Sequence, residues 1–272
     1  MPFTLSHAAA ALAFRKLRFK PIWPALVIGT FAPDLQYFVL LSDEDRSGHH
    51  FPAVLLFTLP AALLVLWLFE RVVKEPAIDL LPDGWQRRLR DKLAPLSFRG
   101  WHQFARIIFW IAAGTLTHLV WDQFTHPYTR TANYLPLLKT HVTPPFWHSM
   151  TVAGLLQDVS TILGFLAICL WCVAWYRRTP PAPRTAVAQF PLRRRLLVAS
   201  FMGLVALFAG YALAWYTLSD HPEPVSRSTR VAVIFIAITQ IFCVEMLIYG
   251  AAKKLRSRSH PIPPPQVEES RR

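Results

Sequence analysis

Charged side chains are scarce in this sequence. Asp, Glu, Lys and Arg make up 17% of its 272 residues, whereas 53% are hydrophobic, including ten Trp and 19 Phe. A typical soluble domain carries about 25% charged residues and lacks long apolar runs. Several windows of this chain approach the roughly 20 apolar residues that a helix needs to cross a bilayer. The low charge therefore argues against a soluble enzyme and predicts an integral helical membrane protein.

Acidic residues are the scarcer part of the charge. The chain has 16 Asp and Glu against 29 Lys and Arg, which gives a formal net charge of +13. A basic chain can indicate nucleic-acid binding. Here, however, Lys and Arg lie mostly in connectors beside apolar runs, where positive charges set the orientation of a membrane protein. We therefore expect the lipid bilayer as a partner and no nucleic acid.

Cysteine is almost absent, and the three that occur, Cys169, Cys172 and Cys243, all lie in apolar runs. An odd count gives no disulfide framework, and one C-x-x-C without a second pair is a weak metal or redox signal. Small apolar packing is the expected role. The sequence also lacks an internal repeat and a basic segment ahead of a first apolar core, so we expect the N-terminus to be retained.

Five or six of the apolar runs are long enough to cross a membrane. These runs are residues 22–41, 51–69, 104–121, 150–176, 196–218 and 231–250. The first is interrupted by Gly29, Pro33 and Asp34, so it is either a kinked span or a re-entrant pair of half-helices. Residues 4–19 predict a short helix that lies at the interface or folds back into the protein. The predicted fold is an all-α polytopic bundle.

Charge divides the chain into four parts. They are a motif-bearing membrane domain (1–176), a basic linker (177–195), two further transmembrane helices of the same bundle (196–252) and a disordered tail (253–272). The connector 70–101, the linker and the tail are rich in Lys and Arg, so the positive-inside rule places them in the cytoplasm. His49, His50, Asp122 and His126 then fall on the opposite face, with Asp34 if residues 22–41 cross outward.

Three ionisable residues, His118, Asp122 and His126, follow one another at intervals of four. Neighbours in this series are about 6 Å apart on one helical face and can share an ion. His118 and His126 are about 12 Å apart on a regular helix, but Pro127 biases His126 out of the helix, so it could fold back or serve a second ion. Imidazole and carboxylate ligands suit zinc and similar metals. The alternative is a polar face that is satisfied by neighbouring helices.

Asp34 lies in an apolar run, where a carboxylate takes up a proton or finds a partner. A metal or a His is the natural partner, and the alternative is the capping of a half-helix beside Pro33. In the loop before residue 51, His49 or His50 could be a metal ligand. Both on one ion is awkward, because adjacent residues on a regular element point apart.

The position of His7 depends on the run 22–41. If that run crosses, His7 starts on the cytoplasmic side, away from the other candidates, and the basic residues at 15–20 favour this interpretation. If the run is re-entrant, His7 could reach them. The residues alone leave both alternatives open.

Four segments carry a resemblance to a known family. They are Pro2-Phe-Thr-Leu-Ser-His7, Gly29-Thr-Phe-Ala-Pro-Asp34, the stretch from Leu116 to His126, and Leu156-Gln-Asp-Val-Ser-Thr-Ile-Leu-Gly164. Together they resemble a bacterial membrane-protein family known only as domain of unknown function 4184, over roughly the first two-thirds of the chain. That family is similar to inner-membrane metal-dependent hydrolases of the YdjM type. The order of the motifs also resembles the zinc-dependent phospholipase C fold.

The resemblance implies a set of metal ligands. These are His7, Asp34, His49 or His50, His118 and Asp122. The leading hypothesis is a metal-dependent hydrolase of the bacterial inner membrane that holds one or two divalent ions, zinc first, with His118 and Asp122 as catalytic residues. A site at the bilayer edge suggests a lipid or phospholipid-like ester as substrate. The alternatives are a non-catalytic protein whose polar cluster serves helix packing or the binding of a partner or lipid, and an ion or proton pathway.

Overall fold

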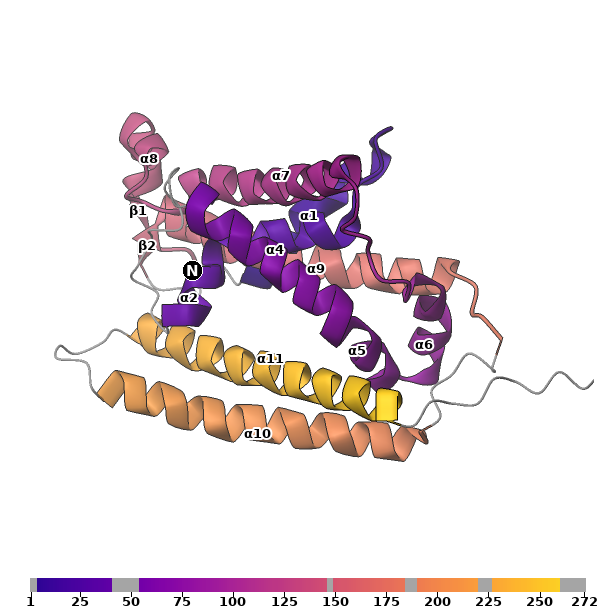
Figure 1. Cartoon of the computed structure of the whole chain (residues 1–272). Coiled ribbons are helices and arrows are strands. Elements are labelled where there is room, and N and C mark those ends of the chain that lie inside the picture. Colours follow the sequence, from indigo (N-terminus) through magenta and orange to yellow (C-terminus); the bar gives the residue numbers. More distant parts are fainter. Residues whose placement is uncertain (1–3, 41–53, 146–148, 184–189, 220–226, 260–272) are drawn as a thin grey trace, which may run out of the picture.

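The computed structural model describes residues 4–40, 54–145, 149–183, 190–219 and 227–259, and almost all of them are helical (Figure 1). The two strands in the described part of the chain, β1 (His141–Val142) and β2 (Met150–Thr151), form a short antiparallel pair. The prediction of an all-α fold is confirmed.

Five helical segments of the described chain are long and apolar enough to cross a membrane. They are Val54–Leu80, Trp101–Tyr134, Val152–Arg178, Leu192–Ser219 and Thr229–Arg256. The first is built from η4 (Val54–Thr58), α4 (Leu59–Leu68), η5 (Phe69–Val73) and α5 (Lys74–Leu80), and the second from α7 (Trp101–Thr125) and the short α8 (Arg130–Tyr134). The others are α9 (Val152–Arg178), α10 (Leu192–Ser219) and α11 (Arg227–Ser259). The chain is therefore a multi-pass membrane protein.

The predicted run 22–41 is broken into shorter pieces and is not one of the five. It forms α1 (Trp23–Phe31), the 3₁₀ turn η2 (Ala32–Asp34) and α2 (Leu35–Leu40). Pro33 has no N–H to continue the helix, so the break falls where Pro disfavours regular α-helix. The carbonyl of Gly29, four residues earlier, instead accepts hydrogen bonds from the Ala32 N–H and from the Thr115 hydroxyl, the latter at 3.3 Å.

The first helix, η1 (Thr4–Lys16), runs antiparallel to α1 along α7. The ring of His7 lies beside His118, whereas the ring of Phe14 meets Trp110, two turns closer to the start of α7. The chain then turns, and α1 and η2 lead back to His118, which Asp34 approaches. His7 and Asp34 therefore lie at the same end of the bundle.

The interpretation that the basic run 15–20 separates His7 from the other candidates is wrong. These residues form the end of η1 and the turn that leads to α1, and they are exposed. A basic run marks the side of the membrane on which it lies itself. His7 is two turns or more away from that run, so it reaches the opposite end of the hairpin.

Two glycines let α1 and α7 pack closely. A Cβ atom on Gly29 would lie 2.2 Å from the carbonyl oxygen of Ile111, and one on Gly114 would lie 2.3 Å from that of Leu26. Leu26 and Ile111 are fully buried in the main apolar core, with Ile107 and Trp110. Small residues at helix contacts are typical of membrane proteins, because lipid gives apolar side chains little reason to associate.

The last two helices form a hairpin that packs on α5 and η5 (Figure 1). Their contact is close at Gly210, where a Cβ would lie 2.5 Å from the Cα of Ile238. α10 begins at Leu192, inside the expected linker 177–195, and the side chain of Arg195 in its first turn is buried. The end of the bundle formed by α5, the start of α10 and the end of α11 is called the basic end below.

Candidate metal centre

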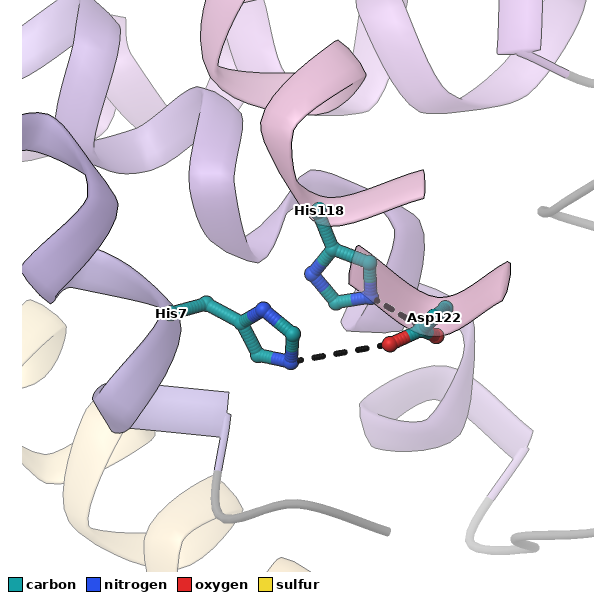
Figure 2. A group of neighbouring side chains, drawn as sticks. All are labelled: His7, His118 and Asp122. Atoms are coloured by element: carbon teal, nitrogen blue, oxygen red, sulfur yellow. Dashed lines mark ion pairs between the residues drawn. The ribbon is translucent and has the colours of Figure 1, made fainter. Parts of the chain in front are cut away.

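The centre is built on the last two turns of α7, where His118 and Asp122 are one turn apart (Figure 2). The Nε2 atom of His118 lies 3.4 Å from Oδ2 of Asp122. Only 1% of His118 is exposed, and Asp122 is also buried. The spacing of four residues therefore produces the shared face that the sequence predicts.

The orientation of the His118 ring is fixed by the backbone of α1. Its Nδ1 atom lies 2.8 Å from the carbonyl oxygen of Thr30. A carbonyl can only accept a hydrogen bond, so Nδ1 carries the proton and donates it. Nε2 is then the atom that faces the carboxylates. Histidines that bind metals are usually held in this way, because the second ring nitrogen fixes both the tautomer and the direction of the ligand atom.

Asp34 reaches the same imidazole from the 3₁₀ turn after α1. Its Oδ1 atom lies 3.4 Å from Nε2 of His118, and the residue is 4% exposed. The carboxylate in the apolar run thus faces a histidine, as expected for a carboxylate that must not stay alone in an apolar environment. Asp34 and His118, 84 positions apart in the chain, meet here because the glycines of α1 and α7 allow close contact.

His7 completes the group from η1 (Figure 2). Its Nε2 atom lies 3.8 Å from Oδ1 of Asp122, and its ring stacks on His118 with a centroid distance of 3.9 Å and an interplanar angle of 19°. Burial, and then the neighbouring His118, lower the pKa of His7 to about 4, although Asp34 and Asp122 oppose this shift. At neutral pH the ring is therefore uncharged and can offer a lone pair.

A small residue on α9 positions η1. A Cβ atom on Gly164 would lie 2.9 Å from the carbonyl oxygen of Ser6, the residue before His7. The backbone of η1 can therefore lie directly on α9. A side chain at position 164 would push Ser6, and His7 with it, away from its present place.

The donor atoms have the spacing of a metal site. One ligand atom from each of His7, His118 and Asp122 lies within 4.8 Å of the other two, and all three residues are buried. In a tetrahedral zinc site with bonds of 2.0–2.1 Å, neighbouring ligand atoms are about 3.3–3.4 Å apart. His118 Nε2 lies at 3.4 Å from an oxygen of both Asp34 and Asp122. The mixed set of imidazole and carboxylate donors fits zinc or a similar transition metal.

His126 lies at the edge of this group. α7 ends at Thr125, and His126 is extended before Pro127, as the sequence predicts. Its Nδ1 atom is 3.9 Å from Oδ2 of Asp122 and 3.3 Å from the Asp122 carbonyl oxygen. It therefore folds back onto Asp122, which is one of the two roles that the sequence left open. His49 and His50 lie outside the described residues.

Sequence reasoning missed the backbone of Thr30, because a carbonyl gives no residue-type signal. It also missed the close approach of Gly29 and Gly114 that brings this carbonyl to His118. The available signal was the presence of glycines in two apolar runs, which is typical of helix contacts in membranes.

The fold and the site define a multi-pass helical membrane protein with a buried group of histidines and aspartates near the end of one span. The chain belongs to the family described as Domain of unknown function (DUF4184), which it matches over residues 1–251. The matched range includes every described residue of the cluster. No curated protein and no solved structure matches the chain significantly.

Proposed function

We propose that the cluster binds a divalent ion, with zinc as the first candidate, and that the protein is a metal-dependent hydrolase of the bacterial inner membrane. The observation that supports this most is the setting of His118. Its Nδ1 atom is committed to the Thr30 carbonyl, and its Nε2 atom lies 3.4 Å from two separate carboxylates. The motif resemblance to hydrolases of the YdjM type agrees with this proposal.

The same distances also suit a protonated His118 between two carboxylates, which is the non-catalytic alternative. His7 favours the metal. Its Nε2 atom is buried and has no hydrogen-bond partner among the described residues. Burying such a nitrogen without a partner costs about 1–3 kcal/mol. A bound ion would offset this cost, whereas an imidazolium at His118 would place a positive charge directly beside the stacked ring.

A divalent ion at this position would polarise a scissile ester and lower the pKa of a bound water. His7, Asp34, His118 and Asp122 would hold it, and the water would be a fifth ligand. The side chain of Asp122 is 11% exposed and that of His126 is 14%, whereas that of His118 is 1%. Substrate and water therefore enter from the Asp122–His126 edge, where these two side chains can accept a proton.

The entry edge lies where α7 ends, so a substrate there would have both polar and apolar parts. Trp121, Phe124 and Tyr128 are exposed close to His126. Aromatic side chains of this kind favour the boundary between lipid and water. We therefore propose a lipid or phospholipid-like ester as the substrate class. The positive-inside rule places this end outside the cytoplasm, because the basic end is the opposite one.

Elemental analysis of the purified full-length protein tests the metal. We expect about one zinc per chain in the natural protein and in His102→Gln, because His102 is exposed in the first turn of the same helix. His118→Gln and Asp34→Asn should lose most of the metal. A folded natural protein without metal in several detergents would contradict the proposal and favour the polar packing cluster.

Hydrolysis tests the second half of the proposal. Fluorogenic phospholipid and carboxylic ester substrates in mixed micelles should be cleaved by the natural protein, and a chelator or His118→Gln should abolish cleavage. A zinc-loaded protein that cleaves none of them would keep the metal centre but remove the assignment as a hydrolase of lipid-like esters.

A further inference from the structure

A second candidate site lies at the basic end, far from the histidines. A half-open cavity of about 220 Å³ lies between α5, the first two turns of α10 and the last turns of α11. A single water needs only about 10–15 Å³ of such space, so the cavity can take a larger group. No residue of the metal centre lines it.

Four cationic side chains and one anionic side chain line the cavity. The cations are Arg194, Arg195, Lys253 and Arg256, and the anion is Asp79. The lining therefore carries a surplus of positive charge.

The acidic side chains around the cavity already form ion pairs with basic residues of the protein. Asp79 pairs with Lys253 and also with Arg90, at 2.9 Å. Arg195 pairs with Asp83 and donates to the Leu81 carbonyl. These pairs neutralise part of the basic surface and hold α5, α10 and α11 together.

Two arginines keep their charge available. Within the described chain, neither Arg194 nor Arg256 forms an ion pair, and both are exposed. Arg194 lies over the ring of Phe190 at 4.4 Å, which holds its guanidinium at the rim of the cavity. Both arginines are thus placed to bind an anion.

The rest of the lining is apolar. It includes Phe190, Val198 and Tyr249. Phe190 comes just before α10, and α10 itself contributes the positive end of a 28-residue helix. A cationic rim above apolar walls at the end of two membrane-spanning helices complements a molecule with an anionic head and an apolar body. Basic pockets between transmembrane helices bind anionic lipid headgroups in this way.

We infer that this cavity binds the headgroup of an anionic glycerophospholipid of the surrounding leaflet. Arg194 and Arg256 contact the phosphate, and the apolar walls receive the start of the acyl chains. The lipid bridges the first turn of α10 and the last turns of α11. This inference is independent of the metal centre, because the two sites lie at opposite ends of the bundle.

Native mass spectrometry of the full-length protein, stripped of lipid in detergent, tests this site. Dioleoyl phosphatidylglycerol should be retained at one copy per chain, and dioleoyl phosphatidylcholine should bind much more weakly. Each arginine near an anionic lipid contributes about a fivefold gain in affinity, so Arg194→Gln with Arg256→Gln should weaken phosphatidylglycerol binding about 30-fold. Equal binding of the two lipids, or unchanged binding by the double variant, would overturn the inference.

Two further variants separate the cavity from its charge. Arg177→Gln with Arg178→Gln removes two exposed arginines from the C-terminal end of α9, which do not line the cavity. Lipid binding by this variant should stay within twofold of the natural protein. Val198→Phe narrows the cavity without a change in charge and should weaken binding, so normal binding by this variant would assign the lipid elsewhere. Displacement of the lipid by equimolar inorganic phosphate would identify a free-anion site and overturn the lipid assignment.

Discussion

The substitution Gly114→Ala tests whether the contact between α1 and α7 assembles the metal centre. A Cβ atom at position 114 would lie 2.3 Å from the Leu26 carbonyl oxygen and 2.8 Å from the Thr30 nitrogen. Ordinary van der Waals contact begins at 3.4 Å, so the two helices must separate by about 1 Å. The obstructing atoms are backbone and cannot rotate away.

A separation of this size would reach the site directly. The hydrogen bond from His118 Nδ1 to Thr30 would lengthen from 2.8 Å to well beyond hydrogen-bond range. The distance from His118 Nε2 to Asp34 Oδ1 would grow beyond its present 3.4 Å. Two ligand atoms of one regular tetrahedral zinc ion, with bonds of about 2.1 Å, cannot lie that far apart. We therefore expect Gly114→Ala to lose most of its zinc and to lower the free energy of unfolding by about 1–3 kcal/mol, the usual cost of overpacking.

The control for Gly114→Ala is Gly203→Ala on α10. No atom lies within 4 Å of a Cβ built at Gly203. Alanine is favoured over glycine in a helix by about 1 kcal/mol, so this variant should keep its zinc and melt at the same or a higher temperature. Thermal melting in detergent and elemental analysis measure both effects. A Gly114→Ala protein with the zinc content and melting temperature of the control would refute the role of the α1–α7 contact.

Three other predictions concern η1, the basic end and the orientation of the protein in the membrane. Gly164→Val should displace Ser6 and His7 and reduce the zinc content, whereas Gly154→Ala, where a Cβ finds ordinary contacts starting at 3.4 Å, should not. Asp83→Ala should lower the free energy of unfolding in a denaturation assay by about 3 kcal/mol, and Arg195→Met by only about 1 kcal/mol. Asp83→Ala leaves the buried Arg195 with an uncompensated charge, whereas Arg195→Met leaves only Asp83 unpaired, and the Asp83 side chain is 59% exposed to water. Equal effects of the two variants would contradict this reasoning. Tyr134→Cys, at a position 85% exposed beyond α7, should react with a membrane-impermeant maleimide in intact cells, in a chain without its native cysteines; labelling only after permeabilisation would reverse the orientation.

Much of the fold could be predicted from the sequence, because length and hydropathy alone define a membrane span. Five of the six apolar runs correspond to helices that can cross. The remaining run, 22–41, was ambiguous because Gly29, Pro33 and Asp34 interrupt it. Whether such a run crosses the membrane depends on the helices that pack against it. Only the structure shows that η1 and α7 pack against this one.

The candidate site was predictable where it follows helical geometry. His118 and Asp122 lie on one face because α7 is regular there, and His126 leaves the helix because of Pro127. The approach of Asp34 to a histidine was one of the two alternatives that the sequence left open, the other being the capping of a half-helix. The position of His7 could not be predicted from the sequence. The basic run after it lies at a turn of the chain, and His7 lies at the opposite end of the resulting hairpin.

The residues of the centre come together because glycines lie at the contacts between the helices that carry them. Lipid does not drive helices together by a hydrophobic effect, so close backbone contact must supply much of the association. Gly29 and Gly114 provide such a contact on one side, and Gly164 provides it on the other, where η1 lies. Residues 8–11 of η1 are all alanine, so this part of η1 carries only small side chains where it packs against α7 and α9. The polar side chains then occupy the interior that these contacts create. Loss of one close contact should therefore cost the site more than loss of a large apolar side chain from its surroundings.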